Sequence, residues 1–208
     1  MTPEKPNKHE LRTKETRALL LQAAETIFVR DGYEGAELGE IATLAGRTKG
    51  AIYAQFKSKE DIFLALVEDR ALSYRTQMEK LITESTTIDG NLAALRNFYL
   101  QRAEEQAWSL LLLEFKLFTI RHPKSKKRLQ GLYAGMLSQN DEKRLAGILG
   151  QAGKGKNAIS RVLAIQLLQP MISALVLEAI FEPALLGEAA IRKVTNRIFD
   201  TLMEVLPR

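Results

Sequence analysis

One short stretch of this sequence offers the chemistry of phosphate binding. Between residues 47 and 59 the chain carries basic side chains and no acidic one. Thr48 stands before a predicted helix at Lys49–Phe56, and a hydroxyl beside the free N–H groups of a helix N-terminus suits a phosphate. An isolated basic cluster is more often a solvated face, but its position around a capped helix favours a nucleic-acid partner. The basic residues are Arg47, Lys49, Lys57 and Lys59.

The elements on either side of this stretch predict how it is held. A short helix at Leu38–Ala45 has one apolar face, and Gly46 follows it where a positive φ ends a helix. The second helix starts after Thr48, and Ser58 with Asp61 resembles a capping box that opens a longer helix. This is the outline of a helix-turn-helix, whose second helix enters the major groove of DNA.

Composition permits this interpretation and argues against several others. The 208 residues carry a formal net charge of +5 and no cysteine, which excludes disulfides and thiolate metal sites. No apolar stretch is long enough to span a membrane and the N-terminus is polar, so we expect a cytoplasmic protein without a membrane partner. The two histidines belong to no nucleophile–base set, metal-ligand spacing or phosphate loop. We therefore expect neither an enzyme nor a metal or cofactor site.

Helical periodicity recurs along the whole chain, and no β pattern appears. The prediction is an all-α fold of about nine helices. We expect a flexible arm at 1–10, a helix-turn-helix domain at 11–57, and a helical effector-binding and dimerisation domain at 58–208. Outside the motif, the expected helices are Thr13–Arg30, Ser58–Leu81, Asn91–Gln106, Trp108–Arg121, Ser125–Gly150, Ser160–Phe181 and Glu188–Leu206.

The N-terminal third resembles the TetR family of bacterial transcriptional regulators, over roughly 17–66. The remainder matches that family only in its number of helices and general pattern. The resemblance implies a homodimer that places one recognition helix of each subunit on half of a palindromic DNA operator. It further implies that a small-molecule effector in the C-terminal domain releases the DNA. The residues that carry it are Arg17, Leu20, Ala24, Phe28, Gly32, Ile41, Ala42, Ala45, Gly46, Lys49, Gly50, Ala51, Ile52, Tyr53, Phe56, Ser58, Lys59 and Glu60.

Individual roles at the DNA follow from residue chemistry and from this resemblance. Lys49 suits a base edge or a phosphate equally, and Gly50 permits close approach of DNA or of the preceding helix. The amide of Gln55 bonds phosphate or adenine, and Arg47 either contacts DNA or is simply solvated. Tyr53 and Lys59 resemble phosphate contacts of the family. The expected DNA-binding residues are Arg47, Thr48, Lys49, Gly50, Tyr53, Gln55 and Lys59; Phe56, Ile52 and Ile41 are expected in the core.

Glu37 departs from the family at the start of the first motif helix. A carboxylate there suits the helix dipole but repels phosphate, so no DNA contact is assigned to it.

Two further sets of residues are candidates for the effector and for the second subunit. The expected pocket is Phe98, Tyr99, Trp108, Glu114, Phe115, Phe118, Tyr133 and Met136, although ordinary core packing is the commoner role of such aromatics. The expected dimer contact is Leu163, Leu167, Ala174, Leu177, Ile191, Val194, Ile198 and Leu202, part of which an intramolecular core must also claim. The alternatives to a ligand-responsive repressor are a helical interaction protein with a degenerate DNA-binding motif and, less favoured, an enzyme.

Overall fold

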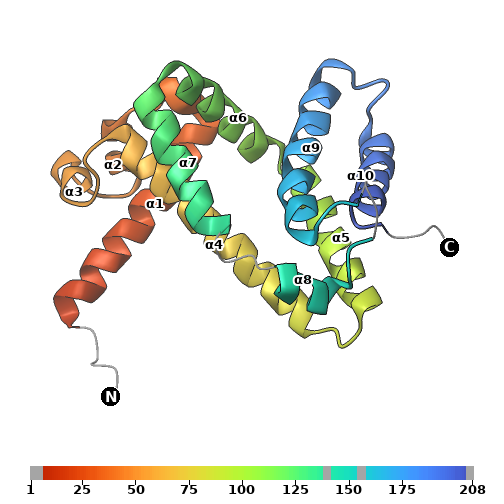
Figure 1. The fold of residues 1–208 in the computed structure, drawn as a ribbon. Helices are drawn as coiled ribbons and strands as arrows, with labels where there is room; N and C mark the ends of the chain where they lie inside the picture. Colours follow the sequence, from red (N-terminus) through yellow and green to blue (C-terminus); the bar gives the residue numbers. More distant parts are fainter. Residues whose placement is uncertain (1–6, 138–141, 154–157, 205–208) are drawn as a thin grey trace. The chain divides into compact units, whose positions relative to one another are not determined.

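The computed structural model describes residues 7–137, 142–153 and 158–204, and within these ranges every regular element is a helix (Figure 1). The predicted all-α class is confirmed. The helices are α1 (Lys8–Gly35), α2 (Leu38–Leu44), α3 (Lys49–Gln55), α4 (Lys59–Thr83), α5 (Ile88–Glu104), α6 (Gln106–Arg121), α7 (Pro123–Leu137), α8 (Glu142–Leu149), α9 (Arg161–Phe181) and α10 (Glu188–Leu202).

Two of the predicted helix limits are wrong. The helix expected at Ser125–Gly150 begins two residues earlier, at Pro123, and is described as α7 and α8; residues 138–141 between them lie outside the described part, and the described helices number ten. The first helix begins at Lys8, because Asn7 accepts N–H groups of the first turn and Glu10 accepts the Asn7 N–H, a complete capping box. Residues 8–10 of the expected flexible arm are therefore helical. Residues 1–6 lie outside the described part of the chain.

The chain divides into two compact units, each with its own core. The first consists of Met1–Ala71 together with Leu113–Leu132, and the second of Leu72–Leu112 together with Tyr133–Arg208. The first unit thus contains the helix-turn-helix and also the segment where α6 ends and α7 begins. The functional boundary predicted at residue 58 is a different kind of division, and it stays a prediction.

An aromatic cluster forms the core of the first unit. Tyr33 is buried beside Phe28 and Phe63, and its ring lies 4.7 Å from Phe115 and 4.8 Å from Phe118, centroid to centroid. Tilted and edge-on contacts of this kind stabilise beyond the area that they bury. The cluster therefore ties α1 and α4 to the end of α6.

The second unit is built around α5, α9 and α10, which pack against one another (Figure 1). One face of α9 is buried in this core, at Ala164, Leu168, Ile172 and Val176. In the described chain, α9 alone is long and apolar enough to cross a membrane by length and composition. One face of α9 thus packs in the core of the second unit, although only 28% of its apolar window is buried.

Candidate nucleic-acid interface

The turn between α2 and α3 has the geometry that the sequence predicts. Gly46 has a φ of +62°, and the N–H of Arg47 donates to the carbonyl of Ala42 over 2.9 Å, which ends α2. Thr48 has extended backbone angles, and its hydroxyl accepts the N–H of Ala51 at 3.3 Å. The N-cap role of Thr48 is thereby confirmed.

Helix α3 has one buried side and one side open to solvent. Ile52 and Phe56 are buried, as is Ile41 of α2, so the predicted core positions are confirmed. Thr48, Lys49, Gly50 and Tyr53 are exposed, Tyr53 by 54% of its surface. Gln55 is half-buried. Tyr53 therefore gains little from packing within the chain, and its role in DNA binding stays a prediction.

Arg47 and Lys59 are turned towards the protein. The guanidinium of Arg47 donates to the Thr16 hydroxyl at 3.4 Å and to the Gly46 carbonyl at 3.1 Å. The ammonium of Lys59 donates to the carbonyls of Glu34 at 2.7 Å and Ala36 at 3.2 Å. These are the free carbonyls where α1 ends, and a cation satisfies them. Both side chains therefore have structural contacts that sequence reasoning missed.

Helix α1 contacts both helices of the motif through two arginine side chains. The guanidinium of Arg17 lies 4.7 Å from the centre of the Phe56 ring, which fixes the end of α3 against α1. Arg30 forms ion pairs with Asp31 and with Glu40 of α2, each at 2.6 Å. Glu37 is the N-cap of α2 but makes no side-chain cap hydrogen bond, in line with leaving it without a contact role.

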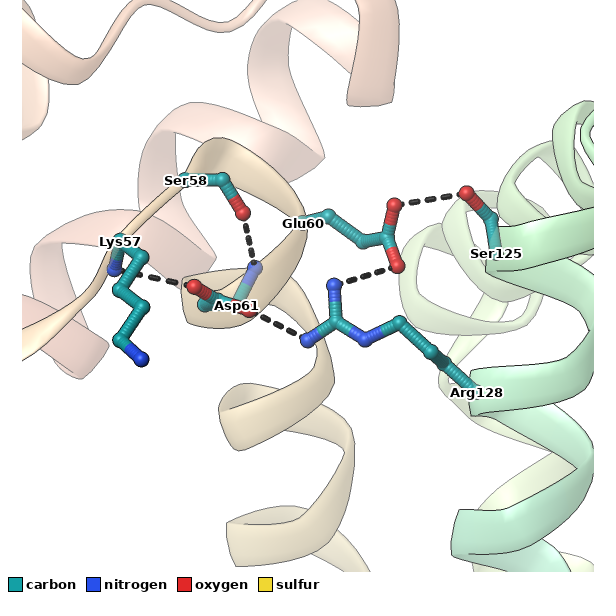
Figure 2. Close-up of polar contacts among 6 residues, drawn as sticks. All are labelled: Lys57, Ser58, Glu60, Asp61, Ser125 and Arg128. Atoms are coloured by element: carbon teal, nitrogen blue, oxygen red, sulfur yellow. Dashed lines mark hydrogen bonds and ion pairs between the residues drawn. The ribbon is translucent and has the colours of Figure 1, made fainter.

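The segment Leu113–Leu132 is bonded to the start of α4, as Figure 2 shows. Ser125 donates its hydroxyl to the Glu60 carboxylate at 2.6 Å, and Arg128 donates to the same carboxylate at 2.6 Å and also to Asp61. Asp61 accepts the N–H of Lys57 at 2.9 Å, which confirms that it reaches back across the cap. Its own N–H donates to the Ser58 hydroxyl at 3.1 Å.

Charge and burial oppose each other at Asp61. Burial alone would raise the pKa of its carboxyl group, but the hydrogen bond and charge of Arg128, with the N–H of Lys57, lower the pKa below its ordinary value. Asp61 therefore stays ionised and keeps Arg128 in place.

A second contact from the same segment comes from Glu114. Its carboxylate accepts the N–H of Tyr33 at 2.8 Å and that of Glu34 at 3.4 Å. Gly32 next to them has a φ of +74° as predicted, but it is a kink inside α1 and not its end, because the helix continues to Gly35. Glu114 is therefore a backbone ligand of the α1 terminus, which the sequence did not indicate.

The expected pocket residues are distributed over both units. Glu114, Phe115 and Phe118 belong to the first unit, whereas Phe98 and Tyr99 lie in the core of the second. Trp108 is buried and Tyr133 half-buried, and burial raises the pKa of Tyr133 to about 12. The side chain of Met136 lies outside the described atoms. A cavity in the second unit is lined by other residues altogether.

The expected dimer residues divide into exposed and buried ones. Leu163 is 45% exposed and Val194 37% exposed. Ala174 is exposed, and the remaining positions except Leu202 are half-buried. Leu202 is 5% exposed and packs in the core of its own chain, so its assignment to the dimer contact is wrong.

Comparison with known proteins agrees with this geometry. Residues 20–66 match the profile of "Bacterial regulatory proteins, tetR family". The likeness to the TetR family is therefore established for this N-terminal segment. These residues run from the buried face of α1 through α3 into α4, so the family match covers the exposed face described above. The matched segment contains the helix-turn-helix formed by α2 and α3.

Individual relatives show how far the likeness extends. The fatty acid metabolism regulator protein of Bacillus subtilis is 26% identical over 151 residues, which are 72% of this chain and 75% of that protein. The transcriptional repressor BepR of Brucella suis is 47% identical over 53 residues, about a quarter of each chain. The solved structure of FadR from Bacillus subtilis with stearoyl-CoA has a TM-score of 0.54 and 20% identity, over 91% of this chain and 99% of that one. That likeness shows a shared fold.

Proposed function

We propose that this protein is a cytoplasmic transcriptional repressor that binds a palindromic operator as a homodimer and is released by a small-molecule effector. The exposed face of α3 supports this most directly. Thr48, Lys49, Gly50 and Tyr53 combine a capped helix N-terminus, a cation, a site of close approach and a ring with a hydroxyl, none of which the core uses. The relative BepR is itself named a repressor.

Binding by two subunits requires a defined distance between their two α3 helices. In helix-turn-helix dimers the two recognition helices lie about 34–36 Å apart, one turn of DNA, or a multiple of it. Thr48 with the N-terminal N–H groups of α3 would fix the register on a phosphate, and Lys49 would reach a base edge or a second phosphate. Within the described helices, exposed apolar side chains on α9 and α10, among them Leu163, Met171 and Val194, offer the face for the second subunit.

The effector would act through α6 and α7, since each contributes residues to both units. Their shared segment holds the start of α4 through Ser125 and Arg128 and the end of α1 through Glu114. A ligand that moves this segment therefore changes the support of α3. It must bind the released state more tightly, by roughly 1–3 kcal/mol for typical coupling. The stearoyl-CoA bound to the relative's structure supports a ligand in the helical domain.

The test is a mobility-shift titration of the purified dimer on DNA from upstream of its own gene, at two salt concentrations. Lys49→Glu should abolish sequence-specific binding, whereas Lys127→Glu, an exposed position with the same change in net charge, should retain it. Lys59 is unsuitable because its ammonium caps α1, so loss of binding there would not separate contact from folding.

The same titration separates the rival functions. A regulator binds one sequence far above background, with strong dependence on salt. A helical interaction protein with a degenerate motif would show no preferred sequence, and that result would refute the proposal. The relatives reported above are named as regulators, so an enzyme is the weaker alternative.

A further inference from the structure

A half-open cavity of about 390 Å³ lies in the second unit, where α5 ends, α9 ends and α10 begins. Its volume falls at the lower end of the range typical of small-molecule sites. Its apolar lining comes from α5 (Leu100, Ala103), α9 (Ala179), the loop after α9 (Pro183, Leu186) and the first turn of α10 (Ile191). The size and lining suit one ring with a short substituent.

Three charged side chains line this cavity: Glu104, Glu188 and Arg192. Arg192 and Glu104 form an ion pair at 3.4 Å with both side chains more than half exposed, so the pair is weak. The lining thus contains two carboxylates and one guanidinium, which gives it a net negative charge at pH 7. The helix ends nearby are two C-termini, of α5 and α9, and two N-termini, of α6 and α10, so their dipoles offset. The two carboxylates therefore make the electrostatic potential in the cavity negative.

We infer that this cavity binds a small amphipathic cation, with its apolar body between α5, α9 and α10 and its positive group against Glu104 and Glu188. The inference deepens the proposed function, because it gives the effector a site and a chemical class. It differs from the pocket expected from the sequence, since none of those eight residues lines this cavity.

Arg192 pairs with Glu104 at the position proposed for the positive group of the ligand. A bound cation must share Glu104 with it or displace it, at the expense of their ion pair. Removing the guanidinium therefore frees a carboxylate and should strengthen binding. Such a gain cannot arise from misfolding.

The experiment is isothermal titration calorimetry on the full chain without DNA. The probes share one shape and differ in charge: para-tert-butylbenzylammonium, para-tert-butylbenzyl alcohol and para-tert-butylbenzoate. The ammonium compound should bind about tenfold more tightly than the benzoate at low salt. Equal or tighter binding of the benzoate, or no binding of any probe at millimolar concentration, would overturn the inference.

Variants locate the site. Arg192→Ala should bind the ammonium probe about fivefold more tightly than wild type, while Arg197→Ala, an exposed arginine outside the lining, should not change it. Leu186→Trp should fill the cavity and abolish binding, whereas Leu185→Trp, at a neighbouring residue that is 73% exposed and outside the lining, should leave it intact. Unchanged affinity in both Arg192→Ala and Leu186→Trp would place the probe elsewhere.

Two further readouts complete the test. Light scattering shows whether Leu186→Trp alters the dimer; if it does, a second copy of the chain covers the cavity and the inference fails. Operator binding is measured separately, with no probe present. A chain that binds its operator but no probe loses only this inference, whereas one that binds the probe but no specific DNA loses the proposed function.

Discussion

Gly32 lacks a Cβ, and this leaves room for the Glu114 side chain of the segment Leu113–Leu132. Its φ of +74° is the left-handed region, and a Cβ there would lie 2.8 Å from both carboxylate oxygens of Glu114. Gly32→Ala should therefore lower the free energy of unfolding by roughly 1–3 kcal/mol, measured by urea denaturation. Gly35→Ala is the matched control in the same helix, because its Cβ would meet only the Asp31 Cβ at an ordinary 3.5 Å. Equal losses in both variants would contradict this account of Gly32.

Arg161 is a buried cation held by backbone carbonyls. Its guanidinium donates to the carbonyls of Gly150 at 2.9 Å, Gln151 at 2.8 Å and Met203 at 2.8 Å. It is 4% exposed. Arg161→Met keeps the length but leaves three carbonyls without a donor, so we expect a loss of about 2–4 kcal/mol in unfolding free energy. The exposed Arg197→Met should change it by less than about 0.5 kcal/mol, and a similar small change in Arg161→Met would show that water replaces the guanidinium.

Residue chemistry predicted the exposed face of α3, but it did not predict the contacts that Arg47 and Lys59 make within the protein. Thr48, Gly46 and Ile52 could be assigned because a cap, a stop and a core position depend on residues within one turn. Arg47 and Lys59 could not, since their partners are backbone carbonyls and a hydroxyl that only the folded chain brings near. Long Arg and Lys side chains can reach such partners although nothing in the neighbouring sequence indicates them.

At the scale of elements, the contact of α7 with α4 should depend on acid. The pKa of Asp61 is lowered in the folded state, so its contribution is present above its ordinary pKa of 3.8 and is lost as the pH falls through the lower, folded value. Unfolding free energy should thus decline below about pH 4 more steeply in wild type than in Arg128→Ala. Lys127→Ala, one residue earlier on α7, should follow the wild-type curve. Parallel curves for all three proteins would deny Asp61 this role.

Helices α9 and α10 carry the second element-scale prediction. Leu163→Lys combined with Val194→Lys places charges on the exposed apolar face, and a charge there cannot be desolvated cheaply. The double variant should run as a monomer in light scattering, with helical content by circular dichroism unchanged. Leu72→Lys, an equally apolar and exposed position on α4, should remain dimeric. A dimer in both proteins would move the contact to another face.

Helix limits were predictable wherever a cap lies in the sequence. Ser160 caps α9 and Thr48 caps α3, close to the expected starts. In the helix expected at Ser125–Gly150, residues 138–141 lie outside the described part of the chain, so the prediction is tested only at α7 and α8. The capping box of Asn7 and Glu10 was likewise present in the sequence and overlooked.

For the whole molecule, the packing of α6 against the helix-turn-helix unit could not be predicted from any local sequence pattern. Phe115 and Phe118 read as pocket aromatics because they share a helix with Trp108, yet they complete the core around Tyr33. Helical periodicity says that a side is apolar and not which partner covers it. The first unit accordingly includes Leu113–Leu132, far along the chain from the motif, and in the proposed function this segment would carry the effect of a ligand to α3.

The salt dependence of DNA binding by Lys49→Ala tests two points at once: whether Lys49 contacts phosphate, and whether two copies of it do so in a dimer. If Lys49 contacts a phosphate, each copy releases one condensed counterion, and the slope of log K against log salt changes by about 0.9 per contact. A dimer should thus lose a slope of about 1.8 and keep its sequence preference. If Lys49 instead reads a base, the slope changes little, while discrimination against a changed base pair falls by about 1–3 kcal/mol.

Titrations at several salt concentrations on the operator and on a point-mutated operator separate these results, with Lys127→Ala as the control of equal charge. A slope change near 0.9 would show one Lys49 on the DNA and argue against a symmetric dimer. No change in slope or in discrimination would remove α3 from the interface, and with it the proposed function.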